Sequence, residues 1–153
     1  MASLVPVATL RSALESLFAA SGVPGADSAL VTDAFLEANL RGVDTHGVRL
    51  APVYLKRLEQ GAINPRPELR VLSDTGACLR LDGDNGLGQV AGMFAMRQAV
   101  ERAGRHGVGL VVVGHTSHIG TGSYYTRLAL EAGMAGFAGS NNLPSIFVWG
   151  GRK

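Results

Sequence analysis

The chain has 153 residues, of which 46% are hydrophobic and 17% are charged. These fractions exclude a disordered protein, which combines few apolar residues with a high charge, and the length suits one domain. The net charge of +2 is too small to indicate a nucleic-acid partner. No apolar run reaches the roughly 18–20 residues that span a bilayer. We therefore expect neither a nucleic-acid nor a membrane partner.

The cysteine content and the first residues indicate a compartment. Cys78 is the single cysteine, so an internal disulfide is excluded and a reducing environment is favoured. The first fifteen residues lack the positive segment that opens a signal peptide. We expect a cytoplasmic protein.

Residues 1–67 have the pattern of a helical segment. Apolar residues recur at helical spacing over residues 10–18, and a glycine and a proline then end that helix. A second helix is expected to begin at Asp27, as its N-cap, and to end near residue 42. A third is expected over about 48–60, with Pro52 confining it or delaying its start.

Beyond residue 67 the pattern changes to that of strands alternating with helices. The expected elements are a hairpin of strands 68–72 and 78–81, a turn at 82–88, a helix over 89–106, a buried strand over 109–113, a polar loop over 114–122, a further helix, and a strand over 134–139. The sequence thus predicts the α/β (mixed α+β) class, with a helical segment over 1–67 and an α/β domain over 68–153. Residues 147–153 end the chain on an apolar segment, so we expect this domain to be incomplete.

A first group of polar residues surrounds His46. This histidine follows Asp44 and Thr45 in a glycine-flanked loop, and Arg49 comes three residues later. A carboxylate can fix the tautomer of an imidazole, and an arginine can hold a substrate carboxylate through two hydrogen bonds. The alternative is that Asp44 or Thr45 caps the next helix and His46 is an ordinary loop residue.

A second group surrounds His115 and His118. Both lie in a glycine-rich loop between an expected buried strand and a helix, the usual place of a ligand site in α/β sheets. An unperturbed imidazole titrates at about 6.5, so either could move a proton near neutral pH. A metal site lacks a third ligand at any familiar spacing, and we expect none. The alternative is a turn with two solvated histidines.

Two glycine-rich stretches, 83–88 and 118–122, are candidates for nucleotide binding. Neither matches the phosphate-binding loop of nucleotide hydrolases or the G-x-G-x-x-G of a Rossmann fold, so a classical dinucleotide fold is not supported. The residues alone predict a small-molecule site built from two loops that carry histidines.

Several motifs, taken together, resemble the malate/L-lactate dehydrogenase family. They follow one another from about Leu10 to the end of the chain: LRGVDTHGV at 40–48, GAINP at 61–65, LDGDNGLGQ at 81–89, HGVG at 106–109, SHIG at 117–120, the Tyr124–Tyr125 pair, and WGGR at 149–152. The resemblance implies hydride transfer between NAD or NADP and a small 2-oxo or 2-hydroxy acid. It also implies a homodimer with a non-Rossmann, mixed-sheet cofactor domain.

The resemblance also implies roles for individual residues. His118 and His46 are the expected proton-transfer residues. Thr45, Arg49 and Tyr54 are expected to bind the substrate, although many family members place the arginine one residue later.

The expected cofactor contacts come from Gly120, Ser140 and Asn142. Family members are considerably longer than this chain, so the resemblance covers their N-terminal part. The alternative is an inactive, truncated protein that acts only through dimerisation or partner contact.

Overall fold

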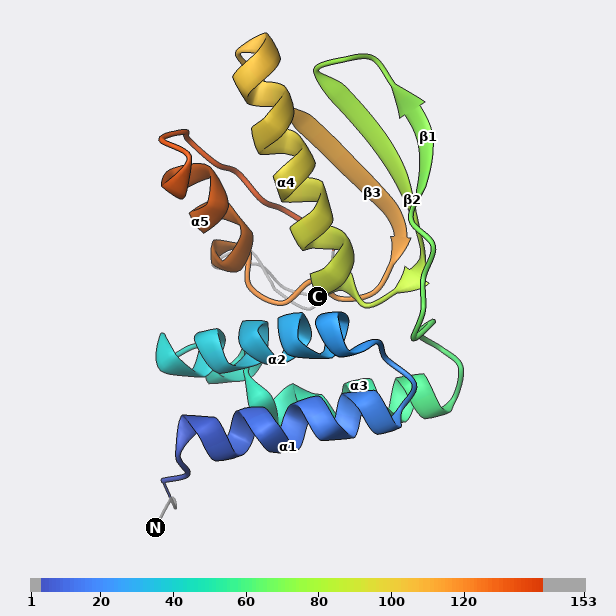
Figure 1. Ribbon diagram of the computed structural model, residues 1–153, viewed down its shortest axis with the longest axis vertical. Coiled ribbons are helices and arrows are strands. Elements are labelled where there is room, and N and C mark those ends of the chain that lie inside the picture. The colour runs from blue at the N-terminus through green and yellow to red at the C-terminus, as the bar shows by residue number, and fades with distance from the viewer. Residues whose placement is uncertain (1–3, 142–153) are drawn as a thin grey trace, which may run out of the picture.

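The computed structural model describes residues 4–141, which form a helical layer beneath a sheet with two further helices (Figure 1). The elements in chain order are α1 (Val7–Ala20), α2 (Gly25–Leu40), the 3₁₀ turns η1 (Asp44–His46) and η2 (Val48–Leu50), α3 (Ala51–Glu59), β1 (Arg70–Asp74), β2 (Cys78–Gly86), α4 (Gly88–His106), β3 (Leu110–Thr116) and α5 (Ser123–Glu131). This order confirms the mixed α/β class. The domain boundary after residue 67 stays a prediction. None of the described helices has the length and apolar character that crossing a membrane requires.

The helical layer is built around three aromatic side chains, one from each helix. Phe35 of α2 lies with its ring centroid 6.0 Å from that of Phe18 in α1 and 5.1 Å from that of Tyr54 in α3. All three are buried. Burying such side chains is the main force that holds short helices together.

Of two expectations about where the helices begin, one is wrong and one is confirmed. The expectation that Asp27 caps α2 is wrong: the helix begins at Gly25, and Pro24 is its N-cap. Pro24 has φ of −56° and ψ of 146°, the extended conformation that is typical of an N-cap residue. The expected effect of Pro52 is confirmed, since it lies in the first turn of α3 and two 3₁₀ turns precede that helix.

The sheet has the order β1-β2-β3 and is mixed. β1 and β2 form the expected hairpin, whereas β2 and β3 are parallel and are connected through α4. The turn expected at 82–88 is instead largely an irregular end of β2. Asp84 and Asn85 there have φ of 48° and 54°, and the pairing with β3 shifts between Asp82 and Gly86.

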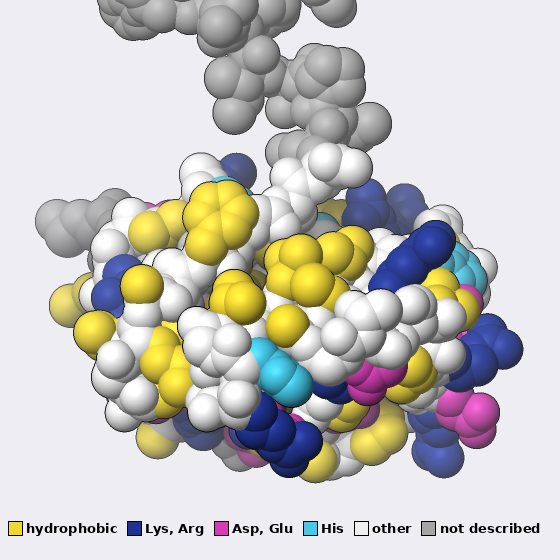
Figure 2. Space-filling view, turned by 90° about the horizontal axis from the view of Figure 1, so that it is seen from above, with side chains coloured by type: hydrophobic (Ala, Val, Ile, Leu, Met, Phe, Trp, Pro, Cys, Tyr) yellow, Lys and Arg dark blue, Asp and Glu magenta, His cyan; other side chains and the backbone are white. Residues whose placement is uncertain are grey.

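One face of the sheet is covered by α4 and the other is exposed (Figure 1). Along β2, Leu79 and Leu81 are buried, whereas Cys78 and Arg80, which alternate with them, are exposed. Figure 2 views the molecule from the end at which α4 ends, where apolar side chains lie among charged ones.

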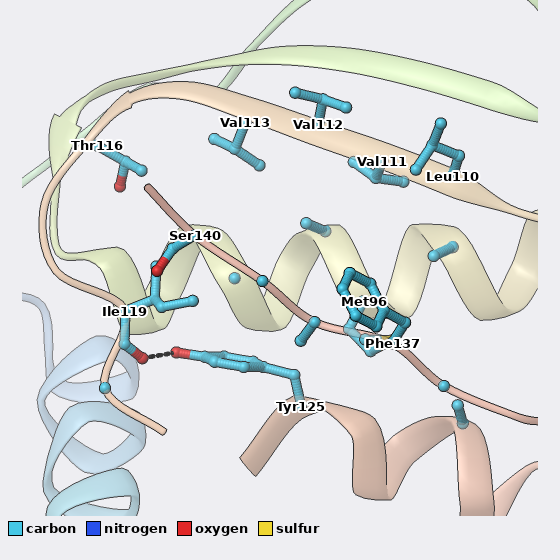
Figure 3. Close-up of a pocket in the computed structure, with 18 of the residues that line it drawn as sticks. Met96, Leu110, Val111, Val112, Val113, Thr116, Ile119, Tyr125, Phe137 and Ser140 are labelled. Atoms are coloured by element: carbon cyan, nitrogen blue, oxygen red, sulfur yellow. Dashed lines mark hydrogen bonds between the residues drawn. The ribbon is translucent and has the colours of Figure 1, made fainter. Parts of the chain in front are cut away.

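The strand expected over 134–139 is wrong. These residues run as an irregular segment past α4, with a pocket between them and β3 (Figure 3). Met134 and Ala138 pack instead with α4 and α5, against buried residues that include Met96 and Ala129. The apolar pattern of residues 134–139 thus correctly indicated that Met134 and Ala138 pack inward. Their neighbours are helices, however, and not the strands of a sheet.

The sheet together with α4 and α5 forms the α/β layer. Its side chains pack against the helical layer of α1, α2 and α3. Leu87, just before α4, is buried in the same cluster as Phe35 and Tyr54. The Tyr124 hydroxyl of α5 lies 3.2 Å from the Asp33 carboxylate of α2. The predicted site residues His46, Tyr54 and His118 meet in this contact region.

Candidate functional site

The loop that carries His46 is held by Asn39, near the end of α2. The side-chain oxygen of Asn39 accepts a hydrogen bond from the Val48 N–H at 2.7 Å, and its amide nitrogen donates to Asp44. Gly47 permits this approach, because a Cβ there would lie 2.1 Å from the Asn39 oxygen. Asp44 therefore binds Asn39, and neither it nor Thr45 caps α3.

The loop that carries His118 rests on the first turn of α4. The Gly88 N–H donates to the Ser117 hydroxyl at 2.9 Å. A Cβ at position 88 would lie 2.3 Å from the Ser117 carbonyl oxygen and 2.4 Å from that of His118. Only glycine allows the loop to lie so close to the helix.

The two loops bring His46 and His118 together. Their rings are stacked, with centroids 5.4 Å apart and planes inclined by 30°. The Thr45 hydroxyl lies 3.0 Å from His46 Nδ1. Both imidazoles line a pocket of about 1620 Å³, which continues along β3 and α4 to the segment before residue 142. Figure 3 shows the part of this pocket between β3, α4 and that segment.

A buried hydrogen-bond chain fixes the His118 ring from behind. The Tyr54 hydroxyl lies 2.7 Å from His118 Nδ1 and 3.0 Å from the His118 carbonyl oxygen, and it accepts a hydrogen bond from Gln89 Nε2 at 3.0 Å. Tyr54 is 2% exposed and Gln89 is 0% exposed. Burial raises the pKa of Tyr54 to about 12, so its hydroxyl stays protonated and can donate.

These contacts define the tautomer of His118. The Gly120 N–H donates to His118 Nδ1 at 3.3 Å, so Nδ1 is an acceptor and the proton of the neutral ring lies on Nε2. Burial lowers the pKa of His118, and the charges of His46 and Arg57 lower it further. The ring is therefore mainly neutral at pH 7. If Nδ1 gains a proton, the Tyr54 O–H can turn to the carbonyl oxygen of His118.

The predicted site residues divide into those that line the pocket and those that do not. Thr45, His46, Tyr54, His118, Gly120 and Ser140 line it. Arg49 is exposed on η2 and is absent from the lining. Asn142 lies outside the described residues.

The other loop histidine, His115, has a different environment. It has φ of 51°, is largely exposed, and lies with Nδ1 3.0 Å from the Asp82 carboxylate. The backbone N–H of Asp84 and the His115 ring lower the pKa of Asp82. Within residues 4–141, no three His, Cys, Asp or Glu side chains converge as metal ligands.

Sequence reasoning missed Gln89 and Arg57. Gln89 closes the motif at 81–89, but nothing in the sequence shows that it is buried against Tyr54. Arg57 lies three residues after Tyr54 on α3, and that spacing is the one signal that it faces the same pocket.

Residues 5–153 match the sequence model of the family described as malate/L-lactate dehydrogenase. The chain belongs to this family. It is 37% identical over 132 residues to the L-sulfolactate dehydrogenase of Methanocaldococcus jannaschii, an overlap of 86% of this chain and 38% of that protein. It is 35% identical over 147 residues to the malate dehydrogenase of Pyrococcus horikoshii, covering 96% of this chain and 41% of the relative.

The fold agrees with the sequence comparison. The structure of the malate dehydrogenase from Pyrococcus horikoshii OT3 superimposes with a TM-score of 0.82 and 36% identity, over 84% of this chain and 37% of that one. The chain thus spans about two fifths of the length of these relatives.

Proposed function

We propose that this chain is the N-terminal part of an oxidoreductase that transfers hydride between NAD or NADP and a small 2-oxo or 2-hydroxy acid. The observation that carries the proposal is the pair of imidazoles from separate loops, stacked 5.4 Å apart at the pocket wall. The names of the relatives, which are dehydrogenases of sulfolactate and malate, support this substrate class.

The proton in this reaction is assigned to His118. In the reductive direction, the imidazolium gives its Nε2 proton to the carbonyl oxygen as the carbonyl carbon gains hydride, and a neutral ring remains. In the oxidative direction, the neutral ring takes the hydroxyl proton. The Tyr54 hydroxyl can form a hydrogen bond with His118 in both protonation states of the ring, because it lies 2.7 Å from Nδ1 and 3.0 Å from the carbonyl oxygen of His118. A positioned histidine of this kind contributes about 10²–10⁴ in rate.

The pocket fits the reactive end of a nicotinamide cofactor. Its walls on α4 and β3 consist mostly of glycine, alanine, valine and other apolar residues, a lining that suits a flat ring. We propose that Gly120 and Ser140 hold that ring, together with Asn142. When bound, the cofactor supplies the hydride for reduction or accepts it in oxidation.

We assign supporting roles to the remaining residues of the site. We propose that Thr45 and His46 contact the substrate, with the Thr45 hydroxyl, 3.0 Å from His46 Nδ1, orienting the His46 ring. Tyr54 acts through His118. Arg49 remains the sequence-based candidate for the substrate carboxylate, in competition with Arg57.

Three further expectations stay predictions: a homodimer, a cytoplasmic location, and the choice between NAD and NADP. The alternative of an inactive protein that acts only through dimerisation or partner contact has no observation in its favour.

The test is the oxidation of NADH or NADPH with pyruvate or oxaloacetate. We expect His118→Ala, in the protein that contains this chain, to lower the rate by about 10²-fold or more. The control is His106→Ala, at the end of α4, which should leave the rate unchanged. Equal rates for wild type and His118→Ala would show that His118 does not transfer the proton in this reaction.

A further inference from the structure

Arg57 stands out in the composition of the pocket wall. Of the residues between 4 and 141 that line the pocket, it is the only Lys, Arg, Asp or Glu. Its neighbours in the wall are apolar or neutral polar residues, apart from the three histidines His46, His115 and His118. A permanent positive charge in such a wall marks the place where an anionic ligand group is favoured.

The helix directs Arg57 toward the proton-transfer residues. Leu50, Val53, Tyr54 and Arg57 all line the pocket, and their spacing of three, four and seven residues places them on one helical face. Arg57 lies one turn beyond Tyr54, about 4.5 Å further along the helix axis. Its charge reaches the site, because it opposes the rise in the pKa of Tyr54 and adds to the lowering of the pKa of His118.

The guanidinium of Arg57 is not neutralised within the described part of the chain. The ion pairs found there involve Arg11, Arg41, Arg70, Arg102, Arg105 and Arg127 but not Arg57. Its backbone is well anchored, since its carbonyl oxygen accepts hydrogen bonds from the Ala62 and Ile63 N–H groups at 2.8 and 3.3 Å. Arg57 is exposed, so the donors of its guanidinium remain available to a ligand.

We propose that Arg57, rather than Arg49, binds the carboxylate of the substrate. The inference rests on the proposed function and names the residue that selects 2-oxo and 2-hydroxy acids over neutral carbonyl compounds. The planar guanidinium can donate two parallel hydrogen bonds to a carboxylate. In a 2-oxo acid the carbonyl carbon is bonded directly to the carboxylate carbon. An anchor on α3, one turn from Tyr54, therefore presents the carbonyl to His118.

Two alternative roles of Arg57 lead to different experimental results. A cation in the last turn of a helix is favoured by the helix dipole, in which case the residue serves stability and no ligand. The anion could also be the diphosphate of a dinucleotide cofactor. The experiment separates both roles from the binding of a substrate carboxylate.

The probe is oxamate, a carboxylate with the shape of pyruvate, titrated into the chain while the ring signals of His46 and His118 are followed by NMR. We expect Arg57→Gln to raise the Kd for oxamate by about 10- to 100-fold. Arg57→Lys keeps the charge and its interaction with the helix dipole but loses the two parallel donors of the planar guanidinium. We therefore expect an intermediate loss of affinity for oxamate. The matched control is Arg97→Gln, an exposed arginine of α4 outside the pocket wall, which should leave the Kd unchanged.

Several results would overturn the assignment. It fails if wild type does not bind oxamate, if Arg57→Gln binds it as tightly as Arg97→Gln does, or if Arg49→Gln causes the larger loss. It also fails if inorganic pyrophosphate, and not oxamate, loses affinity in Arg57→Gln, because the anion would then be the cofactor's diphosphate. Oxamide, the neutral counterpart of oxamate, should bind all variants equally weakly.

Turnover measurements separate this inference from the proposed function. If the protein reduces 2-oxo acids and Arg57→Gln raises KM with little change in kcat, both stand. An unchanged KM in an active enzyme would overturn the inference alone. If Arg57→Gln loses oxamate binding but the wild-type protein shows no turnover, Arg57 would still be the carboxylate-binding residue. The proposed dehydrogenase function would be wrong.

Discussion

At the scale of single residues, the site depends on how His118 is held. Its Nδ1 faces the Tyr54 hydroxyl and the Gly120 N–H, so its Nε2 is left for a ligand. Burial, with the charges of His46 and Arg57, lowers its pKa below the ordinary 6.5. A ring with a lowered pKa is a stronger acid when protonated and is mainly neutral at pH 7.

The lowered pKa of His118 predicts opposite pH dependences for the two directions of the reaction. Reduction needs the imidazolium, so kcat/KM for a 2-oxo acid should rise as the pH falls through 6.5 toward the lowered pKa. Oxidation needs the neutral ring and should fall over the same range. Initial rates at constant ionic strength measure both, and a reductive rate that rises with pH contradicts the assignment.

The same shift has a consequence for stability. The unfolded chain binds a proton at His118 near pH 6.5, whereas the folded chain binds it only at lower pH. The contribution of His118 to the free energy of unfolding is therefore complete above this range and is lost as the pH falls through it.

Gln89 should set the tautomer of His118 through Tyr54. In Gln89→Glu, the new carboxylate accepts the Tyr54 O–H, so the Tyr54 oxygen faces Nδ1 as an acceptor. We expect the neutral ring to move its proton from Nε2 to Nδ1 and the pKa of His118 to rise by about one unit or more. Imidazole ¹⁵N shifts measure both quantities.

Gln98→Glu is the matched control for this change. Gln98 lies on the same helix but is bonded at the surface to Glu101, so its replacement should leave the His118 signals unchanged. Identical His118 spectra for the two variants would show that Gln89 has no influence on the ring.

At the scale of elements, the start of α4 positions the His118 loop. Helix α4 itself follows from its sequence and was expected over 89–106, against 88–106 in the structure. The contact of its first turn with residues 117 and 118 was not expected, because those residues are distant in the sequence. The same limit explains the error at 134–139: apolar spacing reports that a segment is buried but not which neighbour buries it.

Gly88→Ala tests the contact between α4 and the His118 loop. The added Cβ would lie 2.3 Å from a backbone oxygen, so we expect a loss of about 1–3 kcal/mol in the free energy of unfolding and shifted His118 signals. Gly104→Ala is the control on the same helix. Its nearest neighbour would be 3.9 Å away, so it should gain about 0.4–1 kcal/mol. Denaturant unfolding measures both, and equal effects would argue against a tight contact.

At the scale of the whole molecule, the site belongs to neither layer alone. His46 and Tyr54 come from the helical layer, whereas Gln89 and His118 come from the α/β layer. Leu87 is buried in the core of the helical layer. The two layers therefore have to keep a fixed relation for the hydrogen bonds of Tyr54 to exist.

Phe35→Ala tests whether the layers unfold together. Phe35 is 0% exposed at the centre of the helical layer, so its truncation should lower the free energy of unfolding by about 3–5 kcal/mol. We expect the amide protons of α4 to lose protection from hydrogen exchange by the same free energy as those of α2. The control is Leu17→Ala, a residue that is 49% exposed, with an effect of about 0.5 kcal/mol or less. Loss of protection in α1–α3 alone would show that the helical segment predicted over 1–67 unfolds independently of the α/β domain predicted over 68–153.

The sequence by itself determined the elements and the chemistry available to them. Helical spacing, glycines and prolines located most elements to within a few residues, and the two loops with His46 and His118 were recognisable because their residue types act locally. Only the tertiary structure decided that these rings stack, that the Tyr54 hydroxyl contacts His118, and that Arg57 lines the pocket while Arg49 does not. The physical reason is that packing between distant segments sets these relations, and it depends on the shapes of both partners at once.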